Sequence, residues 1–404
     1  MKKTNILWIS LNAPAQKSDK AGGNTFNYYF RHFYNDDRFW VKVIAQVNNN
    51  LPLMNLYDGD SYYLKREGGL RSKLRKLSSI ESKYNPWNRN ANLISNQMES
   101  FVIQKILQLK DKGFVPDVVI LEWTQCVVLA GIVRKYFPDV YMVASEHDVT
   151  FVGYKRMAEY FSGLRRLLWK FKYTQERKVE LNALKECNLI LPQNWDNRRL
   201  LIQEGIAEKK IQWLVPYFND MRGCRRSPDG KDILFFGAMA RLENYLSAIW
   251  FMDNVMPLLE DMDIRFVVLG SNPPAELKKY ESERVHITGF VDSITPFFEN
   301  SVCLVAPLVL GAGIKVKILE ALSSGIPVLT NDIGIEGIAA EHGKEYIHCN
   351  TPLDYERAIR KVFSDATVGD ELAKNAKRFI EKNYSIEKSL ADYKERLLRI
   401  GEQK

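Results

Sequence analysis

Residues 307–330 read PLVLGAGIKVKILEALSSGIPVLT and predict the loop, helix and second strand of a strand–helix–strand unit. An apolar run at 302–306 precedes them and predicts a buried strand, and 326–330 predicts the next strand. Between the strands, 307–311 predicts a glycine-containing loop and 314–324 a helix. Because such units build parallel sheets covered by helices, this stretch predicts a doubly wound α/β domain.

The same stretch carries residues suited to an anionic ligand. A helix start offers unpaired N–H groups and a positive dipole end, and Gly311 and Gly313 let the backbone come close to an anion. Lys315 adds a positive charge, and Glu320 can accept hydrogen bonds from a diol. Phosphate at the helix start and ribose further along describe a nucleotide diphosphate. The alternative is a plain glycine loop with a solvated lysine and a surface glutamate.

Length and composition limit the class of protein. The chain has 404 residues, 46% hydrophobic and 26% charged, which predicts a soluble globular protein of two or three domains. No apolar run approaches the roughly 20 residues of a transmembrane helix. The opening run 6–11 fits a buried strand better than a signal peptide. Five widely spaced cysteines predict reduced, mostly buried thiols rather than disulfides or a zinc site.

Charge is distributed unevenly along the chain. Residues 1–215 hold 33 Lys and Arg against 21 Asp and Glu, a net charge of +12, whereas the remainder holds 24 against 28, a net charge of −4. A basic first half suggests an anionic partner, such as nucleic acid, a phosphorylated substrate or a membrane surface. No nucleic-acid-binding module surrounds the basic residues, so we expect no nucleic-acid partner.

The pattern of apolar runs divides the chain into two α/β domains. We predict an N-terminal domain at 1–215, a turn-rich linker at 216–231 and a C-terminal domain at 232–384. Two doubly wound domains usually bind ligand at the carboxyl ends of their strands. The predicted strands are 6–11, 40–47, 118–121, 141–145, 189–191, 211–215, 233–236, 265–269, 302–306 and 326–330, and the predicted helices are 24–34, 93–109, 165–185, 243–259 and 314–324. We read the polar region at about 50–90 as loop insertions or a mobile flap.

Motifs over nearly the whole chain resemble glycosyltransferase family 4. The donor-binding signature of that family is similar to GAGIKVKILEALSSGIPVLT at 311–330 followed by GIEG at 334–337. The GG pair at 22–23, EHD at 146–148, FFGAM at 235–239 and YSI at 384–386 also occupy the expected places. The resemblance implies a GT-B fold: two Rossmann-like domains that face a central cleft, with a C-terminal helix at about 385–400 that crosses back to the N-terminal, acceptor-binding domain. It also implies a retaining nucleotide-sugar transferase.

Two departures from the family pattern concern the diphosphate site. Many members carry an arginine and a lysine early in the second domain, where this chain has Ala238 and Glu243. Many also carry two glutamates eight residues apart, and here Glu320 matches the second while Ala312 stands at the first. The chain resembles a branch with a GxGxK loop, which implies that Lys315, backbone amides and Arg241 neutralise the diphosphate. A structural salt bridge remains the alternative for Arg241.

By this resemblance His147, Lys315 and Glu320 are the catalytic residues, and His147 contacts the transferred sugar. Lys317 we expect to be solvated. For the paired glycines the alternative is a plain turn, with Asn24 or Thr25 capping the following helix. No nucleophile is assigned. The residues expected to bind the donor are Gly22, Gly23, Gly237, Arg241, Gly311, Ala312, Gly313, Ile314, Lys315, Glu320, Glu336 and Gly337.

Two further segments have competing interpretations. Asp58-Gly59-Asp60 resembles a metal-binding DxD motif, but Asp-Gly is a common turn pair, and we expect neither a metal nor another cofactor. Residues 163–178, GLRRLLWKFKYTQERK, predict a helix with Leu164 and its apolar neighbours on one stripe and basic and aromatic residues opposite. Such a helix suits an anionic membrane surface, as does the basic cluster at 71–76, and the alternative is a solvated helix that packs on its domain.

We therefore expect a glycosyltransferase that moves a sugar from a nucleotide diphosphate sugar to a glycan or lipid-linked acceptor with retention, in the synthesis of cell-surface polysaccharide or glycoconjugates. The expected location is the cytoplasm, either free or peripheral at the inner face of the plasma membrane. Two alternatives remain open. A GT-B sugar-nucleotide epimerase needs no acceptor, and a non-catalytic GT-B subunit acts through a partner.

Overall fold

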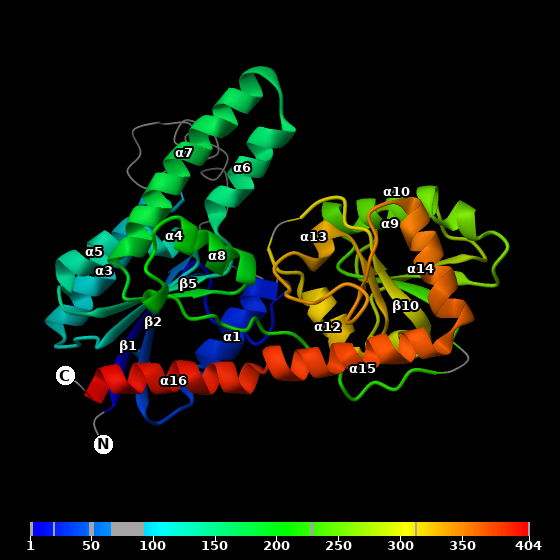
Figure 1. The fold of residues 1–404 in the computed structure, drawn as a ribbon. Coiled ribbons are helices and arrows are strands. Elements are labelled where there is room, and N and C mark those ends of the chain that lie inside the picture. The colour runs from blue at the N-terminus through cyan, green and yellow to red at the C-terminus, as the bar shows by residue number, and fades with distance from the viewer. Residues whose placement is uncertain are drawn as a thin grey trace. The chain divides into compact units, whose positions relative to one another are not determined.

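The computed structural model describes residues 3–18, 21–47, 52–65, 93–227, 230–311 and 313–402. The chain forms two compact units, shown as a ribbon in Figure 1. Unit 1 comprises Met1–Tyr217 together with Ile386–Lys404, and unit 2 comprises Phe218–Ser385. The predicted linker at 216–231 is thus divided at residue 217, and most of it belongs to unit 2. The predicted basic cluster at 71–76, Ala312 and most of the 50–90 region lie outside the described residues.

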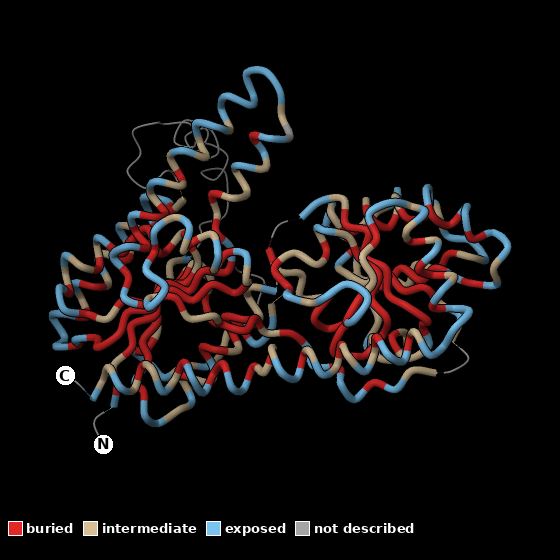
Figure 2. The backbone as a smooth tube through the Cα atoms, in the orientation of Figure 1, coloured by how far each residue is buried: buried red, intermediate tan, exposed pale blue. Residues whose placement is uncertain are grey.

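Unit 1 contains a parallel six-stranded sheet in the order β3-β2-β1-β4-β5-β6. The central strands are buried along their whole length, because helices cover both faces (Figure 2). The strands are β1 Thr4–Ser10, β2 Phe39–Val47, β3 Ser61–Lys65, β4 Val118–Glu122, β5 Tyr141–Glu146 and β6 Leu189–Pro192.

Successive side chains of β1 enter two different cores. Leu7 and Ile9 pack in one cluster with α3 Asn96–Asp111, whereas Ile6 and Trp8 pack in the other with α1 Ala21–Tyr34. The C-terminal helix α16, Ile386–Glu402, joins the second cluster through Leu390, Tyr393 and Leu397. The other unit 1 helices are α4 Thr124–Val127, α5 Ala130–Tyr136, α6 Thr150–Tyr160, α7 Gly163–Glu186, α8 Trp195–Gln203 and η1 Glu208–Lys210.

Unit 2 repeats the topology with a sheet in the order β12-β11-β10-β7-β8-β9, again parallel throughout. Its strands are β7 Asp232–Phe236, β8 Arg265–Leu269, β9 Val285–Gly289, β10 Ser301–Ala306, β11 Val328–Thr330 and β12 Ile347–His348. Its helices are α9 Leu242–Asn254, η2 Met256–Leu259, α10 Ala275–Lys278, α11 Thr295–Glu299, α12 Val316–Ser324, α13 Asp332–Ile335, α14 Pro352–Ser364 and α15 Ala366–Asn383.

Several predicted elements differ from the observed ones. The predicted strand at 211–215 is wrong: Ile211 makes a single bridge to Ile190, and the neighbouring strand β6 ends at Pro192, which has no N–H to continue a ladder. The predictions also missed α6 and β3, the latter within the region interpreted as irregular loops. Helix α1 begins at Ala21, so Gly22 and Gly23 lie in its first turn, and Asn24 and Thr25 do not cap it.

Helix α16 is tied to α1 by polar contacts as well as apolar ones. The Tyr29 hydroxyl donates to the Val215 carbonyl oxygen at 2.8 Å, and the Val215 N–H donates to Ser389 Oγ at 3.1 Å. Lys394 Nζ donates to Asp36 Oδ2 at 2.8 Å. The pKa of Asp36 lies well below its ordinary value because Arg38, and with it Lys394, stabilises the carboxylate.

All five cysteines are buried and free, as the sequence predicts. Among the described residues, none of the helices combines the length and apolar character needed to cross a lipid bilayer.

Candidate functional site

The carboxyl ends of β7 and β10 mark the switch point of the unit 2 sheet. These strands are neighbours, but the chain leaves β7 toward β8 on one side and leaves β10 toward β11 on the other. Loops that diverge in this way open a crevice in which doubly wound domains bind ligands. The two loops, 237–241 and 307–315, contain most of the donor-binding residues that the sequence predicts.

The glycine loop after β10 has the backbone geometry that requires glycine. Gly311 has φ 141° and Gly313 has φ 72°, and a Cβ on Gly311 would lie 3.0 Å from Lys315 Cε. Helix α12 starts at Val316 rather than at the predicted residue 314, because Lys315 is still extended at φ −95° and ψ 93°. No side chain within the described part of the chain caps this helix start, so its first N–H groups face the loop.

Lys315 is held inside this loop by two acceptors. Its Nζ donates to the Gly313 carbonyl oxygen and lies 3.3 Å from Glu336 Oε2. Glu336 belongs to the predicted GIEG motif, so the structure brings together two donor-binding predictions that are 21 residues apart in the sequence. In the same motif, a Cβ on Gly334 would lie 1.9 Å from Thr330 Oγ1, and Gly337 has φ 75°. The motif therefore needs its glycines to pack against β11.

Lys317 is the residue that the sequence interpretation missed. It was expected to be solvated, but the side chain is half-buried: its Nζ donates to Asn244 Oδ1 at 2.9 Å and lies 4.8 Å from the centroid of the Phe235 ring. Burial, together with the positive charges of Lys315 and Arg241, lowers the pKa of Lys317 to about 7. Within the described ranges, no carboxylate forms an ion pair with this ammonium group.

A signal for Lys317 was present in the sequence. It precedes Glu320 by three positions, which at 100° per residue places the two side chains 60° apart on the same side of the helix. A lysine beside the carboxylate already assigned to the ligand could therefore have been included in the site.

Asn244 connects Lys317 to the loop after β7. Its Nδ2 donates to the Ala238 carbonyl oxygen at 2.9 Å, and a Cβ on Gly237 would lie 2.9 Å from the same nitrogen. Glycine at position 237 thus makes room for the amide that orients Lys317. Arg241 pairs with Glu243, and its side chain is 61% exposed, so it has the structural ion pair that the sequence left open as the alternative.

Glu320 is buried in helix α12, beside Asn219 near the start of unit 2. Its Oε1 accepts hydrogen bonds from the Asn219 backbone N–H at 3.2 Å and from Asn219 Nδ2 at 2.9 Å. Burial raises the pKa of Glu320 to about 7 in spite of these two donors. Hydrogen bonds from the segment that was predicted as a linker therefore hold this carboxyl group. A diol could donate a further hydrogen bond to it.

In unit 1 the corresponding position is the carboxyl end of β4, next to β1. Glu122 Oε1 lies 2.5 Å from His147 Nε2 and accepts from Ser145 Oγ at 2.8 Å, while Glu122 Oε2 accepts from Trp8 Nε1 at 2.8 Å. Trp123, with φ 65°, stacks on the His147 ring at 4.9 Å between centroids. The imidazole is thus fixed by a carboxylate on one side and by an indole ring on another.

The paired glycines lie beside this imidazole. A Cβ on Gly22 would stand 3.0 Å from His147 Nδ1, and a Cβ on Gly23 would stand 2.2 Å from Ser18 Oγ. Among the residues that the structure describes, His147 Nδ1 is buried without a hydrogen-bond partner. Gly22 and His147, both predicted site residues, therefore meet in unit 1, with the Nδ1 atom directed at the first turn of α1.

Glu146 does not share this environment. The sequence placed the side chains of 146–148 together at the strand end, but Glu146 is fully buried and its Oε2 accepts from Thr124 Oγ1 at 2.7 Å. Burial raises the pKa of Glu146 to about 8. The alternation of side chains at the end of β5 explains the difference, since Glu146 and His147 point to opposite faces.

The Asp58-Gly59-Asp60 segment forms a turn, with Gly59 at φ 84°. Asp60 Oδ1 accepts from Lys42 Nζ at 2.9 Å and from Trp40 Nε1 at 3.2 Å, and both side chains of the ion pair are about nine-tenths buried. In the described ranges, no group of three His, Cys, Asp or Glu residues is arranged to hold a metal ion.

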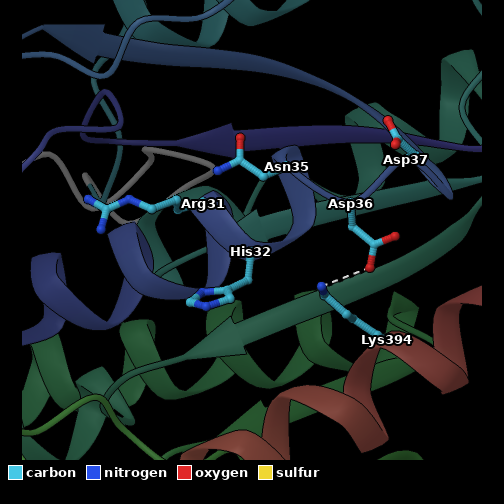
Figure 3. Close-up of a pocket in the computed structure, with 6 residues that line it drawn as sticks. All are labelled: Arg31, His32, Asn35, Asp36, Asp37 and Lys394. Atoms are coloured by element: carbon cyan, nitrogen blue, oxygen red, sulfur yellow. Dashed lines mark hydrogen bonds and ion pairs between the residues drawn. The ribbon is translucent and has the colours of Figure 1, made fainter.

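An open pocket in unit 1 lies at the opposite edge of the sheet. Figure 3 shows it between the end of α1 and α16, with the Asp36–Lys394 ion pair across it. The end of a helix that follows a parallel strand lies at the amino edge of the sheet, away from the usual ligand position. This pocket therefore belongs to the attachment of α16. Its lining residues are Arg31, His32, Asn35, Asp36, Asp37 and Lys394.

Parts of the sequence are similar to known proteins. Residues 230–365 match a family model described as "Glycosyl transferases group 1". A protein described as an uncharacterized 44.6 kDa protein in the cps region of Klebsiella pneumoniae is 26% identical over 195 residues, which are 45% of this chain and 50% of that protein. The chain thus spans about half the length of this relative.

Solved structures resemble the chain over its full length. Sucrose-phosphate synthase from Thermosynechococcus elongatus has a TM-score of 0.69 at 11% identity, and the match covers 100% of both chains. Anabaena HepE in complex with UDP has a TM-score of 0.64 at 13% identity, over 98% of this chain and 99% of that one. Another structure of HepE contains UDP-glucose. The fold is GT-B, as predicted, and residues 230–365 resemble group 1 glycosyltransferases.

Proposed function

We propose that this chain is a retaining glycosyltransferase that transfers a sugar from a nucleotide diphosphate sugar to a glycan or lipid-linked acceptor. The observation that carries the proposal is the half-buried Lys317 ammonium at the unit 2 switch point. A cation in this position is costly without an anion, and a donor diphosphate supplies one. The position falls inside the 230–365 match to group 1 glycosyltransferases.

The proposed diphosphate site combines two lysines with backbone donors. Lys317 takes the place of the lysine that many relatives carry at position 243, because it reaches Asn244 from the first turn of α12. Lys315, already close to Glu336, and the open start of α12 complete the positive surface. These groups stabilise the phosphate that leaves when the glycosidic bond to the donor breaks. Glu320 accepts hydrogen bonds from the ribose hydroxyls.

In unit 1 we assign His147 to contact the transferred sugar. Glu122 accepts a hydrogen bond from Nε2, and Nδ1 is buried beside Gly22 with no hydrogen-bond partner among the described residues. Glu122 is accordingly a positioning residue, because it acts through the imidazole. No covalent nucleophile is assigned, and the chemistry rests on leaving-group stabilisation and on the placement of the acceptor hydroxyl. Retention follows from the family resemblance.

The acceptor and the donor base are proposed from the relatives. A cps-region relative supports an acceptor in cell-surface polysaccharide synthesis, and the UDP and UDP-glucose complexes of a structural neighbour make UDP-sugars the first donors to test. The proposed location is the cytoplasm, with a peripheral position at the inner face of the plasma membrane.

The decisive experiment is a donor screen. Purified protein is incubated with UDP-, GDP- and dTDP-sugars, with and without lipid-linked glycan acceptors, and products are followed by mass spectrometry. We expect release of the nucleoside diphosphate and an acceptor heavier by one sugar, whose anomeric configuration by NMR matches the donor. An isomerised sugar from donor alone would instead indicate an epimerase, and calorimetry that shows no nucleotide binding would indicate a non-catalytic subunit.

A further inference from the structure

Helices α6 and α7 form an antiparallel hairpin on unit 1. Figure 1 shows both helices extending away from the sheet of unit 1, and Figure 2 shows that the end of the hairpin is coloured as exposed. The base is fixed, because the Glu180 carboxylate accepts the N–H groups of Thr150 at 3.0 Å and Phe151 at 3.1 Å and so caps the start of α6. In the tip, 161–171, every residue is exposed or half-buried.

The two helices pack through aromatic side chains. Trp169 of α7 stacks near Tyr154 of α6, with centroids 5.8 Å apart, and near Phe161, with centroids 6.4 Å apart. Lys172 Nζ lies 5.5 Å from the Tyr154 centroid. The Trp169 side of α7, which the sequence placed opposite the leucine stripe, is therefore the inner side of the hairpin.

The leucine stripe consequently faces outward. The exposed fractions are 81% for Leu164, 61% for Leu167, 55% for Leu168 and 49% for Phe171. Four large apolar side chains within eight residues form a contiguous exposed patch of the kind that marks an interaction surface.

Charge at the same hairpin selects the partner. Residues 150–172 contain six Lys and Arg and one acidic residue, a net charge of +5. Arg165, Arg166 and Lys170 are exposed on the same tip of the hairpin. A twofold contact with a second copy would bring two such positive surfaces together, which is unfavourable. A nucleic acid would use the cations but would leave the leucines exposed to water.

We propose that the tip of the α6–α7 hairpin docks this protein on an anionic lipid membrane surface. The leucines and Phe171 enter the boundary between headgroups and acyl chains, and the arginines and lysines bind lipid phosphates around them. This inference goes beyond the proposed reaction and does not depend on it, since it concerns hairpin residues of unit 1 to which the proposed reaction assigns no role.

The test is co-sedimentation of the full chain with vesicles. Vesicles of equal parts phosphatidylglycerol and phosphatidylcholine are compared with pure phosphatidylcholine at low and at 0.5 M salt. We expect binding to the anionic vesicles that weakens with salt. Reversing two cations in R165E/R166E should weaken it more than about 25-fold, since losing each cation costs about fivefold and each new carboxylate is repelled by the lipids. Replacing the outward leucines in L167S/L168S should weaken it about tenfold or more.

Matched controls use residues that are not part of the hairpin. Lys278 and Lys279 are an exposed adjacent pair, so K278E/K279E makes the same change of net charge in unit 2. Val115 and Leu353 are 63% and 51% exposed, so V115S/L353S removes comparable apolar surface. Both controls should bind vesicles like the unaltered chain, and calorimetry with a nucleotide should give the same affinity for every variant.

Three results would overturn the proposal. The unaltered chain could fail to bind anionic vesicles, or the hairpin variants could bind as well as the controls. Alternatively, sedimentation equilibrium could show a dimer that L167S/L168S converts to monomer, which would mean that a second copy covers the leucines. Failure of the donor screen would leave each of these outcomes unaffected.

Discussion

Replacing Lys317 with methionine should stabilise the free protein and weaken donor binding at the same time. Methionine keeps most of the length of the side chain but removes the ammonium group that lies 2.9 Å from Asn244 Oδ1. Most substitutions in a binding site do not raise stability, so the combination of opposite effects is specific to a buried cation that awaits an anion.

The magnitude follows from the pKa. A shift from 10.5 to about 7 corresponds to roughly 5 kcal/mol at 1.36 kcal/mol per pKa unit. The folded pKa is depressed, so this penalty is absent above pH 10.5, grows as the pH falls, and is complete below pH 7. At pH 8 it amounts to about 3 kcal/mol, which solvent screening of a half-buried group reduces further. After loss of the bond to Asn244, about 1–2 kcal/mol of stabilisation should remain.

For the donor the sign is reversed. A charge-assisted hydrogen bond to phosphate contributes about 1.5–3 kcal/mol, so Lys317→Met should weaken nucleotide-sugar binding about 10- to 150-fold. Lys317 is mostly neutral at pH 8, so the diphosphate should draw a proton onto it. Calorimetry in two buffers of different ionisation enthalpy should detect uptake of close to one proton by the unaltered chain and none by the variant.

The control is Lys278→Met, which removes an exposed lysine of unit 2 and should change neither quantity. Thermal unfolding of the free protein at pH 8 measures the stability. If Lys317→Met binds the donor within threefold of the unaltered chain, or if binding takes up no proton at pH 8, the assignment of Lys317 to the diphosphate is refuted.

Three further substitutions test the remaining assignments. Glu320→Gln should raise the unfolding temperature at pH 8 and have little effect near pH 4, because the pKa is raised from 4.5 to about 7, so the cost of ionising this buried carboxyl group is absent below pH 4.5, grows as the pH rises and is complete above pH 7; equal effects at both pH values would contradict this. Glu122→Gln should lower the transfer rate about 10- to 100-fold and leave donor affinity unchanged, since it acts through His147; a loss of affinity instead would make Glu122 structural. Gly22→Ala should lower both activity and stability, the latter by about 1 kcal/mol, because its Cβ meets the imidazole at 3.0 Å, whereas Gly153→Ala, with nothing within 4 Å, should be neutral or stabilising.

Local sequence predicted the elements well where one physical cause dominates. The strand at 265–269 is observed with the predicted bounds, because a short apolar run between polar turns has few alternatives to a buried strand. Gly311 and Gly313 were predicted to let the backbone approach an anion, which stays a prediction; the structure shows that both have positive φ values, which glycine adopts readily. The helix that follows them was predicted from its apolar period.

Tertiary structure decided which side chains are buried, and by what. Lys317 was expected in solvent because a lysine on a helix is usually solvated, but Phe235 of β7 and Asn244 of α9 contact its ammonium group. Glu122 carried no sequence signal at all, since its role depends on Trp8 and His147, which are distant in the chain and meet only at the end of the sheet. Burial of a polar group is a property of the packing around it, which periodicity cannot report.

The α7 helix shows the division most clearly. Its sequence alone determined that Leu164, Leu167, Leu168 and Phe171 share one side and that Trp169 lies on the other, because the helical repeat sets the angle between residues. Which side faces a partner was left to the packing of α6. Aromatic rings on α6 receive Trp169, so the leucines remain outside. A helix carries its pattern in its sequence, but only its neighbours in the fold decide which face meets solvent.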